Sequence, residues 1–264
     1  MPRAHKYWVN GAAYHLTHRC HDRAFLLASA EDRSRYVELL REHLHEFEVS
    51  LLNYTVTCNH IHLLVTADEA AHVARLMRTV QGEFAAAYNR RNGRSGAFWS
   101  DRYHATIIDD GEHLMACMRY IDLNMVRAGV ITHPDQWMWT GWHELVGMVE
   151  PSGIINISAL LKRLDQPCRL RFRNHYRETI EQALLKPKLN IRESRWTESV
   201  AMGSLDFLQH VEADLDLAGL RRRLRREESA VNRWCLREQS PDYPQPEPSN
   251  AVSGICPNNT INYA

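Results

Sequence analysis

The feature that constrains this chain most is a strand-like apolar run that contains two histidines. Residues 49–66 read VSLLNYTVTCNHIHLLVT, which is long enough for two strands with a break at TCN. Side chains alternate across a strand, so His60 and His62 share one face while Ile61 and Leu63 share the other. The strand rise sets the two imidazoles about 7 Å apart. We therefore predict a strand with apolar side chains on one face and a pair of histidines on the other.

The flanking segments predict a mixed order of strands and amphipathic helices. Ser29 is a typical helix N-cap, and Gly129 stands where the C′ residue of a third helix is expected. The predicted order is strand, helix, two strands, helix, strand and helix, over residues 12–20, 29–47, 49–66, 69–91, 103–109 and 111–129. This order with short connections indicates the α+β class, with a ferredoxin-like antiparallel sheet and helices on one face.

The remainder of the chain is richer in arginine and predicts a helical C-terminal extension. Candidate helices are ISALLKRL and VEADLDLAGLRRRLRREE, and the second contains the densest positive run of the chain, Arg221–Arg226. That run fits either a DNA backbone or a solvated helix face. The last stretch is proline-rich and lacks periodicity. We expect three regions: a catalytic-type domain at 1–147, the helical extension at 148–238 and a flexible tail at 239–264.

Charge and cysteine usage limit the class of protein. Lysine plus arginine and aspartate plus glutamate both number 32, so any nucleic-acid binding must come from local patches. The six cysteines form no CxxC pair, and we expect reduced thiols in a cytoplasmic protein. No stretch approaches the roughly 20 apolar residues of a membrane span.

A second candidate pair lies on the predicted third helix. Tyr120 and Asn124 are four residues apart and therefore share one helix face. A phenol and a carboxamide in that arrangement suit a nucleophile and an oxygen ligand. Taken alone, each pair also fits ordinary packing: paired core or surface histidines, and a buried-edge tyrosine beside a helix-end asparagine.

Three motifs together are more specific than either pair. The segments NHIHLLV, GAFWSDRY and GEHLMACMRYIDLNMVRAG stand in this order, and the stretch from about Gly11 through WMWTGW resembles the REP-associated tyrosine transposases, a branch of the single-tyrosine HUH transposases. The resemblance implies that His60, His62 and Asn124 hold a divalent metal, Mg²⁺ or Mn²⁺. It also implies that Tyr120 is the nucleophile.

The activity implied by the resemblance is a metal-dependent single-stranded DNA endonuclease or transposase. Such an enzyme nicks and rejoins DNA at hairpin-forming palindromic repeats through a 5′-phosphotyrosine. A tyrosine hydroxyl has an unperturbed pKa of about 10, so a metal or a base must favour the phenolate. The alternative is a domesticated hairpin-binding protein with weak or no cleavage. A rolling-circle initiator is disfavoured because neither a P-loop nor a second helix tyrosine is evident.

Basic and aromatic residues between the motifs suit single-stranded DNA through phosphate contacts and base stacking. The two aromatic side chains fit core packing equally well, and the arginines fit solvated charges. The DNA-binding candidates are Arg19, Arg23, Arg94, Trp99, Arg102 and Tyr103.

Two positions depart from the family pattern. Cys58 and Met125 stand where relatives commonly have proline, and a Cys58 thiolate on the histidine face would favour zinc. The short connection into the Tyr120 helix favours a monomer with a self-contained site over an exchanged helix. We expect the protein to be cytoplasmic and associated with the nucleoid, with no membrane partner.

Overall fold

The computed structural model describes residues 7–150, 153–185, 193–217, 224–230 and 233–238. Its strands are β1 (Ala13–Arg19), β2 (Ser50–Val56), β3 (His60–Thr66), β4 (His104–Ile108), β5 (Ala201–Gly203), β6 (Leu224–Ala230) and β7 (Arg233–Glu238). Its α-helices are α1 (Ala30–Leu44), α2 (Ala70–Arg91), α3 (Glu112–Asp122), α4 (Asn124–Arg127), α5 (Trp142–Leu145), α6 (Ile157–Arg163), α7 (Arg169–Leu184), α8 (Arg195–Glu198) and α9 (Leu205–Leu217). Two short 3₁₀ turns, η1 (His21–Arg23) and η2 (Pro134–Gln136), complete the described elements.

The first four strands form the predicted ferredoxin-like core of an α+β fold. Among the described residues, the sheet runs in the order β2-β3-β1-β4-β5-β7-β6. Strand β1 pairs antiparallel with both β3 and β4, and β2 pairs antiparallel with β3. The break between β2 and β3 lies at residues 57–59, as the TCN letters predict.

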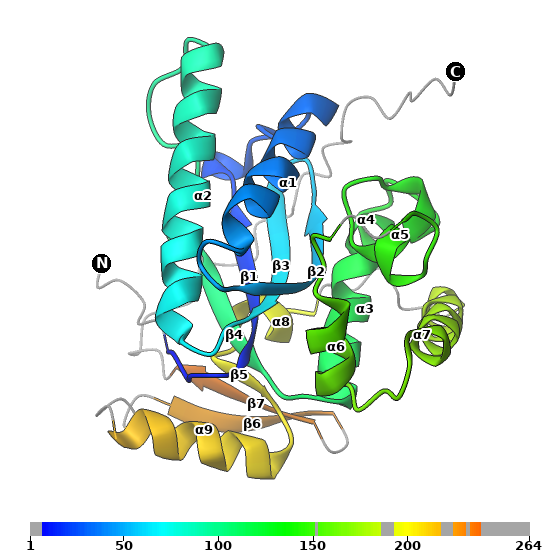
Figure 1. Cartoon of the computed structure of the whole chain (residues 1–264). Coiled ribbons are helices and arrows are strands. Elements are labelled where there is room, and N and C mark those ends of the chain that lie inside the picture. The colour runs from blue at the N-terminus through cyan, green and yellow to red at the C-terminus, as the bar shows by residue number, and fades with distance from the viewer. Residues whose placement is uncertain (1–6, 151–152, 186–192, 218–223, 231–232, 239–264) are drawn as a thin grey trace.

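Helices cover both faces of the sheet, which corrects the expectation of a single covered face. Helices α1 and α2 lie side by side in front of the first strands in Figure 1, and Tyr36 of α1 is hydrogen-bonded to Gln81 of α2. Helix α3 lies on the other face, where the hydroxyl of Thr55 donates to the carbonyl of Ile121. Thr55 is paired with His62, so α3 covers the histidine face. Strand alternation defines two faces but does not say which helix covers each.

Helix ends follow the sequence signals. The Ser29 hydroxyl accepts the backbone N–H of Asp32 at 3.0 Å, the hydrogen bond expected of an N-cap. Gly129 follows α4 with a φ of 69°, the left-handed conformation in which glycine carries no Cβ penalty. Ser29 therefore marks the start of α1, and Gly129 marks the end of the segment that contains α3 and α4.

The C-terminal extension is helical but also lengthens the sheet. Strand β5 pairs parallel with β4, and β7 pairs antiparallel with both β5 and β6, so residues after 147 share a sheet with residues before it. The helix expected over 211–228 ends at Leu217 as α9. Arg225 and Arg226 belong to β6 instead, while residues 221–223 and the tail at 239–264 lie outside the described residues.

The described residues contain no helix long and apolar enough to cross a membrane. Cys20, Cys117, Cys168 and Cys235 are free thiols, as expected. Cys58 departs from that expectation because it is disulfide-bonded.

Candidate functional site

Strand register assembles the polar face of the sheet. Thr17 of β1 stands between His62 of β3 and His104 of β4, so these three side chains form a row across three strands. Arg19 is paired with His60 at the end of the same face. His15, two residues before Thr17, projects on this face too.

A chain of hydrogen bonds fixes the tautomer of His62. His15 Nδ1 lies 2.9 Å from the carbonyl oxygen of Trp196, and a carbonyl can only accept, so Nδ1 carries the proton. His15 Nε2 is therefore the acceptor for His62 Nδ1 at 2.8 Å, which leaves His62 Nε2 with its lone pair. Burial lowers the pKa of His15 to about 3 and lowers the pKa of His62 well below its usual value. Both imidazoles are thus neutral, the form in which histidine binds a metal.

Hydrogen bonds to neighbouring residues fix the same tautomer in His60 as in His62. Its Nδ1 lies 2.7 Å from Asn59 Oδ1, and Asn59 Nδ2 donates to the carbonyl of Arg23, which fixes the orientation of the amide. The Nδ1 proton therefore belongs to the bond with Asn59, and Nε2 is the unprotonated nitrogen. The two imidazoles meet edge to face with ring centroids 4.9 Å apart. The two histidines thus present equivalent nitrogen donors.

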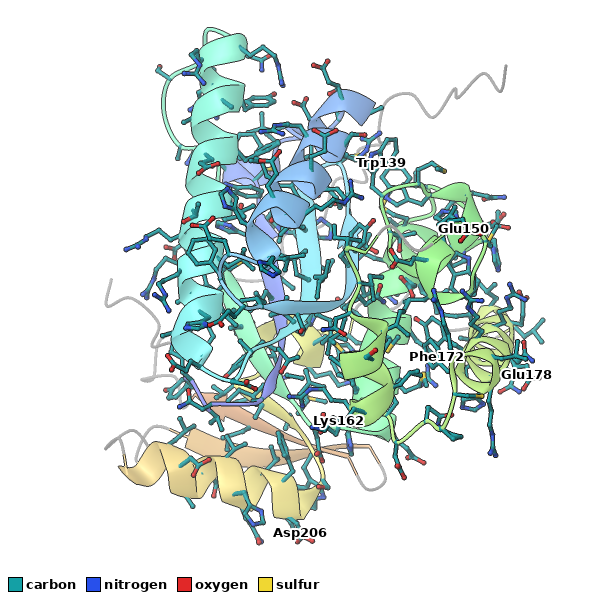
Figure 2. All side chains as sticks on the ribbon, in the orientation of Figure 1. Trp139, Glu150, Lys162, Phe172, Glu178 and Asp206 are labelled. Atoms are coloured by element: carbon teal, nitrogen blue, oxygen red, sulfur yellow. The ribbon has the colours of Figure 1, made fainter. Side chains whose placement is uncertain are left out.

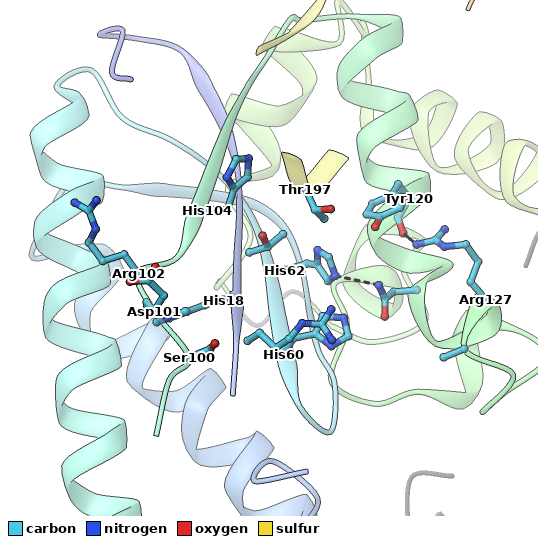
Figure 3. A pocket seen from close by; sticks show the side chains of 14 residues that line it. His18, His60, His62, Ser100, Asp101, Arg102, His104, Tyr120, Arg127 and Thr197 are labelled. Atoms are coloured by element: carbon cyan, nitrogen blue, oxygen red, sulfur yellow. Dashed lines mark hydrogen bonds between the residues drawn. The ribbon is translucent and has the colours of Figure 1, made fainter. Parts of the chain in front are cut away.

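Helices α3 and α4 bring the phenol and the carboxamide to these histidines. Tyr120 lies in α3 with its ring centroid 5.7 Å from that of His62. Leu123, at φ −83° and ψ 6°, separates the two helices, and Asn124 is the first residue of α4. Asn124 Nδ2 lies 3.0 Å from His62 Nε2 (Figure 3). An amide nitrogen and oxygen exchange places on a flip, so the same side chain can present its oxygen here.

Arg127 adds a cation beside Tyr120. Its guanidinium carbon lies 4.0 Å from the centroid of the Tyr120 ring, and Nη2 donates to the Tyr120 carbonyl (Figure 3). Burial lowers the pKa of Arg127. A cation over an aromatic face is favourable, and it also stabilises negative charge on the phenol oxygen.

These groups surround an open cavity of about 400 Å³. Its lining includes one acidic residue, Asp101, and three arginines, so the cavity favours anions such as phosphate. The lining residues are Thr17, His18, Arg19, His60, His62, Ser100, Asp101, Arg102, His104, Tyr120, Asn124, Arg127, Ala128 and Thr197.

The donor set fits a hard divalent cation that retains open positions. Among the described residues there is no group of three His, Cys, Asp or Glu side chains able to hold a metal. Two imidazole nitrogens and one amide oxygen are available instead, which is an incomplete set that phosphate oxygens can complete. Mg²⁺ and Mn²⁺ accept such mixed, partly open coordination.

Cys58 does not join the histidine face. Its sulfur accepts a hydrogen bond from Arg33 Nη1 of α1 at 3.7 Å, and α1 covers the opposite face of the sheet. The turn at residues 57–59 breaks the alternation on which the zinc alternative depended. A Cys58 thiolate ligand is therefore excluded by the geometry.

The predicted DNA-binding residues fall into two groups. Arg19 and Arg102 line the cavity. Arg23 does not line it, and its backbone carbonyl accepts a hydrogen bond from Asn59 Nδ2. Arg94, Trp99 and Tyr103 do not line the cavity either, although Trp99 and Tyr103 both contact the ring of His18, which does. Trp99 stacks on His18 and donates to the Gln81 carbonyl, Tyr103 is 9% exposed, and Arg94 bonds to Asn89 and to the Ala97 carbonyl.

Part of the chain that builds this site is similar to a known protein family. Residues 8–124 match the family described as "Transposase IS200 like". This match covers less than half of the chain, and we call residues 8–124 the transposase domain after the family that they match. The match confirms the relationship that the three motifs predict, at the level of the IS200-like transposases.

Two solved structures are similar to parts of this chain at low sequence identity. One is a REP-associated tyrosine transposase bound to a REP hairpin, at 16% identity over 60% of this chain and 90% of that one, with a TM-score of 0.47. Another is described as a transposase from Deinococcus radiodurans R1, at 19% identity over 44% and 91% of the two chains, with a TM-score of 0.32. No curated protein matches the chain.

Part of the candidate site lies outside the transposase domain. The family match stops at Asn124, yet Arg127 and Trp196 both contact Tyr120, and Trp196 also holds His15. Sequence reasoning missed His15, Arg127 and Trp196. His15 was detectable, because pairing β1 with β3 places it on the His62 face; Trp196 was not, because it lies 181 residues from its partner.

Proposed function

We propose that the chain is a metal-dependent single-stranded DNA transesterase that nicks and rejoins DNA at hairpin-forming palindromic repeats. The observation that carries this proposal is the convergence of Tyr120, His62 and Asn124 in one arginine-lined cavity. The transposase domain supports DNA as the substrate. The REP-hairpin specificity of the proposed activity comes from the motif resemblance.

His60, His62 and Asn124 would hold the divalent metal, Mg²⁺ or Mn²⁺. When bound, such an ion polarises a phosphoryl oxygen and neutralises charge that develops in the transition state. The protein's own part is to keep both Nε2 lone pairs aimed into the cavity. His15 and Asn59 do this by accepting the Nδ1 protons.

Tyr120 would supply the nucleophile. Its phenol oxygen forms a bond to the phosphorus as the bond from phosphorus to the 3′ oxygen breaks, and the phenol proton is transferred to solvent while the leaving oxygen gains one. The products are a 5′-phosphotyrosine and a free 3′ hydroxyl. Attack by a 3′ hydroxyl on the phosphotyrosine reverses the step and rejoins strands without an external energy source.

Arg127 would assist the same step. Its guanidinium lies over the Tyr120 ring and lines the cavity, so it stabilises the phenolate and attracts the scissile phosphate. Arg19 and Arg102 would hold flanking phosphates of the single strand at the cavity. Arg23, Arg94, Trp99 and Tyr103 remain candidates for contacts farther along the strand.

A single chain would suffice for the reaction. Tyr120 and His62 of the same chain are in ring contact, which favours a monomer over a dimer that exchanges helices. The catalytic region would be residues 1–147, extended by Trp196 from the region 148–238. The substrate would place the protein at the nucleoid in the cytoplasm.

The direct test is nicking of labelled hairpin oligonucleotides taken from palindromic repeats of the source genome. With Mn²⁺ or Mg²⁺ we expect a released 5′ fragment that ends in a 3′ hydroxyl and a 3′ fragment linked to the protein through its 5′ phosphate, and neither fragment after chelation. Binding of the hairpins without cutting under any divalent ion would replace this proposal with the hairpin-binding protein.

A further inference from the structure

Helix α7 of the extension carries two parallel stripes of side chains. Phe172, Tyr176 and Ile180 are fully buried, and Figure 2 shows Phe172 on the side of α7 that faces the molecule. Arg173 and Arg177 follow Phe172 and Tyr176 by one position, and Arg169 lies four residues before Arg173. Steps of four residues rise about 6 Å each, so these arginines form a line about 12 Å long beside the buried stripe. We call this line the α7 arginine stripe.

The α7 arginine stripe has no acidic partner among the described residues. Arg177 Nη2 donates to the carbonyl of Val146 at 2.6 Å. Arg169 Nε and Nη2 and Arg173 Nε are buried without an acceptor. These three nitrogen atoms are covered by the protein itself, so a ligand outside it would bind the other nitrogens of the two guanidinium groups.

The arginines of the stripe also repel one another. Desolvation, followed by the charges of Arg169 and Arg177, lowers the pKa of Arg173, and Glu150 opposes the shift only in part. The next residue of the stripe is Glu181, but its carboxylate contacts His133 Nε2 at 3.2 Å. Like charges four residues apart destabilise a helix, so the stripe costs stability unless an anion lies against it.

The form of the stripe favours a polyanion over a single anion. One phosphate or carboxylate can reach one or two of three guanidinium groups spread over about 12 Å. Each DNA strand carries a charge every 3.4 Å along its axis, so a backbone can meet all three arginines together. Arginine donates two parallel hydrogen bonds to a phosphate, which suits such a contact.

Helix α7, which carries the stripe, contacts helix α3, which carries the candidate nucleophile Tyr120. Tyr176 of α7 donates its hydroxyl to Asp122, which follows Tyr120 by two residues in α3. Trp142 of α5 packs against Tyr176 as well, with ring centroids 5.7 Å apart. Tyr120 and Asp122 project from different sides of α3, so a duplex that continues from a single strand in the cavity would cross α3 to reach α7.

We propose that the α7 arginine stripe binds the phosphate backbone of the paired stem of the hairpin, outside the cavity that holds the single strand. The proposal rests on the proposed function for the identity of the DNA. It assigns a substrate-binding role to residues beyond the transposase domain. The cavity would position the strand to be cut, and the stripe would hold the duplex next to it.

The test compares two triple variants that remove the same charge. One is Arg169→Gln, Arg173→Gln and Arg177→Gln. The control is Arg35→Gln, Arg75→Gln and Arg78→Gln on α1 and α2, which cover the opposite face of the sheet. Binding of a fluorescent hairpin, and of the same foot sequence without a stem, is measured with chelator present across a series of salt concentrations. Circular dichroism melting checks that each full-length variant folds.

We expect the stripe variant to bind the hairpin at least about tenfold more weakly, with a salt slope shallower by up to about 2.7 for three duplex phosphate contacts. Binding of the stemless strand should change little, and the control variant should keep wild-type hairpin binding. Equal losses with both DNAs, or hairpin binding that the stripe variant retains, would overturn the proposal. Retained binding would leave an acidic protein surface as the candidate partner.

Failure of this inference is distinguishable from failure of the proposed function. A covalent adduct with unchanged hairpin binding by the stripe variant contradicts the stripe alone. Stripe-dependent binding of the stem without any adduct contradicts the transesterase alone.

Discussion

His15 Nε2 accepts the Nδ1 proton of His62 at 2.8 Å, and this bond fixes which nitrogen of His62 faces the cavity. The bond extends from the carbonyl of Trp196 through His15, so a residue of the extension determines the tautomer of a histidine in the transposase domain. The proposed metal site therefore depends on residues outside the NHIHLLV motif.

Loss of the His15 acceptor should weaken metal binding. We expect His15→Phe to lower Mn²⁺ affinity by about 10–100-fold, the range for loss of a group hydrogen-bonded to a metal-binding histidine, because His62 can then adopt the other tautomer. His15→Gln keeps an acceptor near His62 Nδ1 and should recover part of the affinity. Calorimetry measures both, and long-range ¹H–¹⁵N NMR of the metal-free protein reports the His62 tautomer directly. Wild-type Mn²⁺ affinity in a folded His15→Phe protein would contradict the assigned role.

Metal binding should depend on DNA. Three arginines and one aspartate line the cavity, so a divalent cation alone meets net positive charge. Phosphate oxygens reverse that balance and complete the coordination. Mn²⁺ is titrated into the Tyr120→Phe protein with and without hairpin DNA and followed by electron paramagnetic resonance. We expect tighter Mn²⁺ binding when the hairpin is present. The same Mn²⁺ affinity with and without DNA would contradict this prediction.

Arg127 should contribute to the rate of adduct formation rather than to folding of the site. A cation over an aromatic ring is worth about 0.5–2 kcal/mol, which corresponds to a rate loss of roughly 2–30-fold for Arg127→Gln. Arg127→Lys retains the charge and should lie between the variant and the wild type. Single-turnover adduct formation measures the effect, and an unchanged rate in Arg127→Gln would exclude the contribution.

Asp122 should make the stability of the protein depend on pH. Burial raises the pKa of Asp122 to about 6, although Tyr176, Thr140 and Asn53 all donate hydrogen bonds to its carboxylate. The folded state therefore binds the proton more tightly than the unfolded state. The stabilising contribution is present below about pH 4 and is lost as pH rises to about 6, a change of about 3 kcal/mol.

Urea unfolding of wild-type and Asp122→Asn proteins at pH 4 and pH 7 isolates this contribution. The difference in unfolding free energy between the two proteins should favour the wild type more at pH 4 than at pH 7. A difference that is the same at both pH values would contradict a raised pKa.

Local patterns predicted most of the core but not how its parts meet. Ser29, Gly129 and the alternation around His62 signalled caps and faces because those signals act within a few residues. The position of α3 opposite α1 depends on packing across the sheet. Strand β5 has only three residues, and β6 and β7 lack clear alternation. Cys58 was assigned to the wrong face because the turn at 57–59 interrupts the strand period.

The site was predictable where its residues share one element. His60 with His62, and Tyr120 with Asn124, follow from strand and helix periods. The contributions of His15, Arg127 and Trp196 arise from tertiary contacts, in one case across 181 residues of sequence. Trp99 and Tyr103 lie in packed surroundings, which a composition suited to base stacking does not distinguish from an exposed platform.

The most direct test of the account is the identity of the residue that becomes linked to DNA. Wild-type and Tyr120→Phe proteins are incubated with labelled hairpin and Mn²⁺, denatured and digested, and the nucleotide-bearing peptide is sequenced by mass spectrometry. We predict a 5′-phosphotyrosine at Tyr120 in the wild type, and hairpin binding without adduct in Tyr120→Phe. An adduct that persists in Tyr120→Phe, or one mapped to another residue, would contradict the central claim.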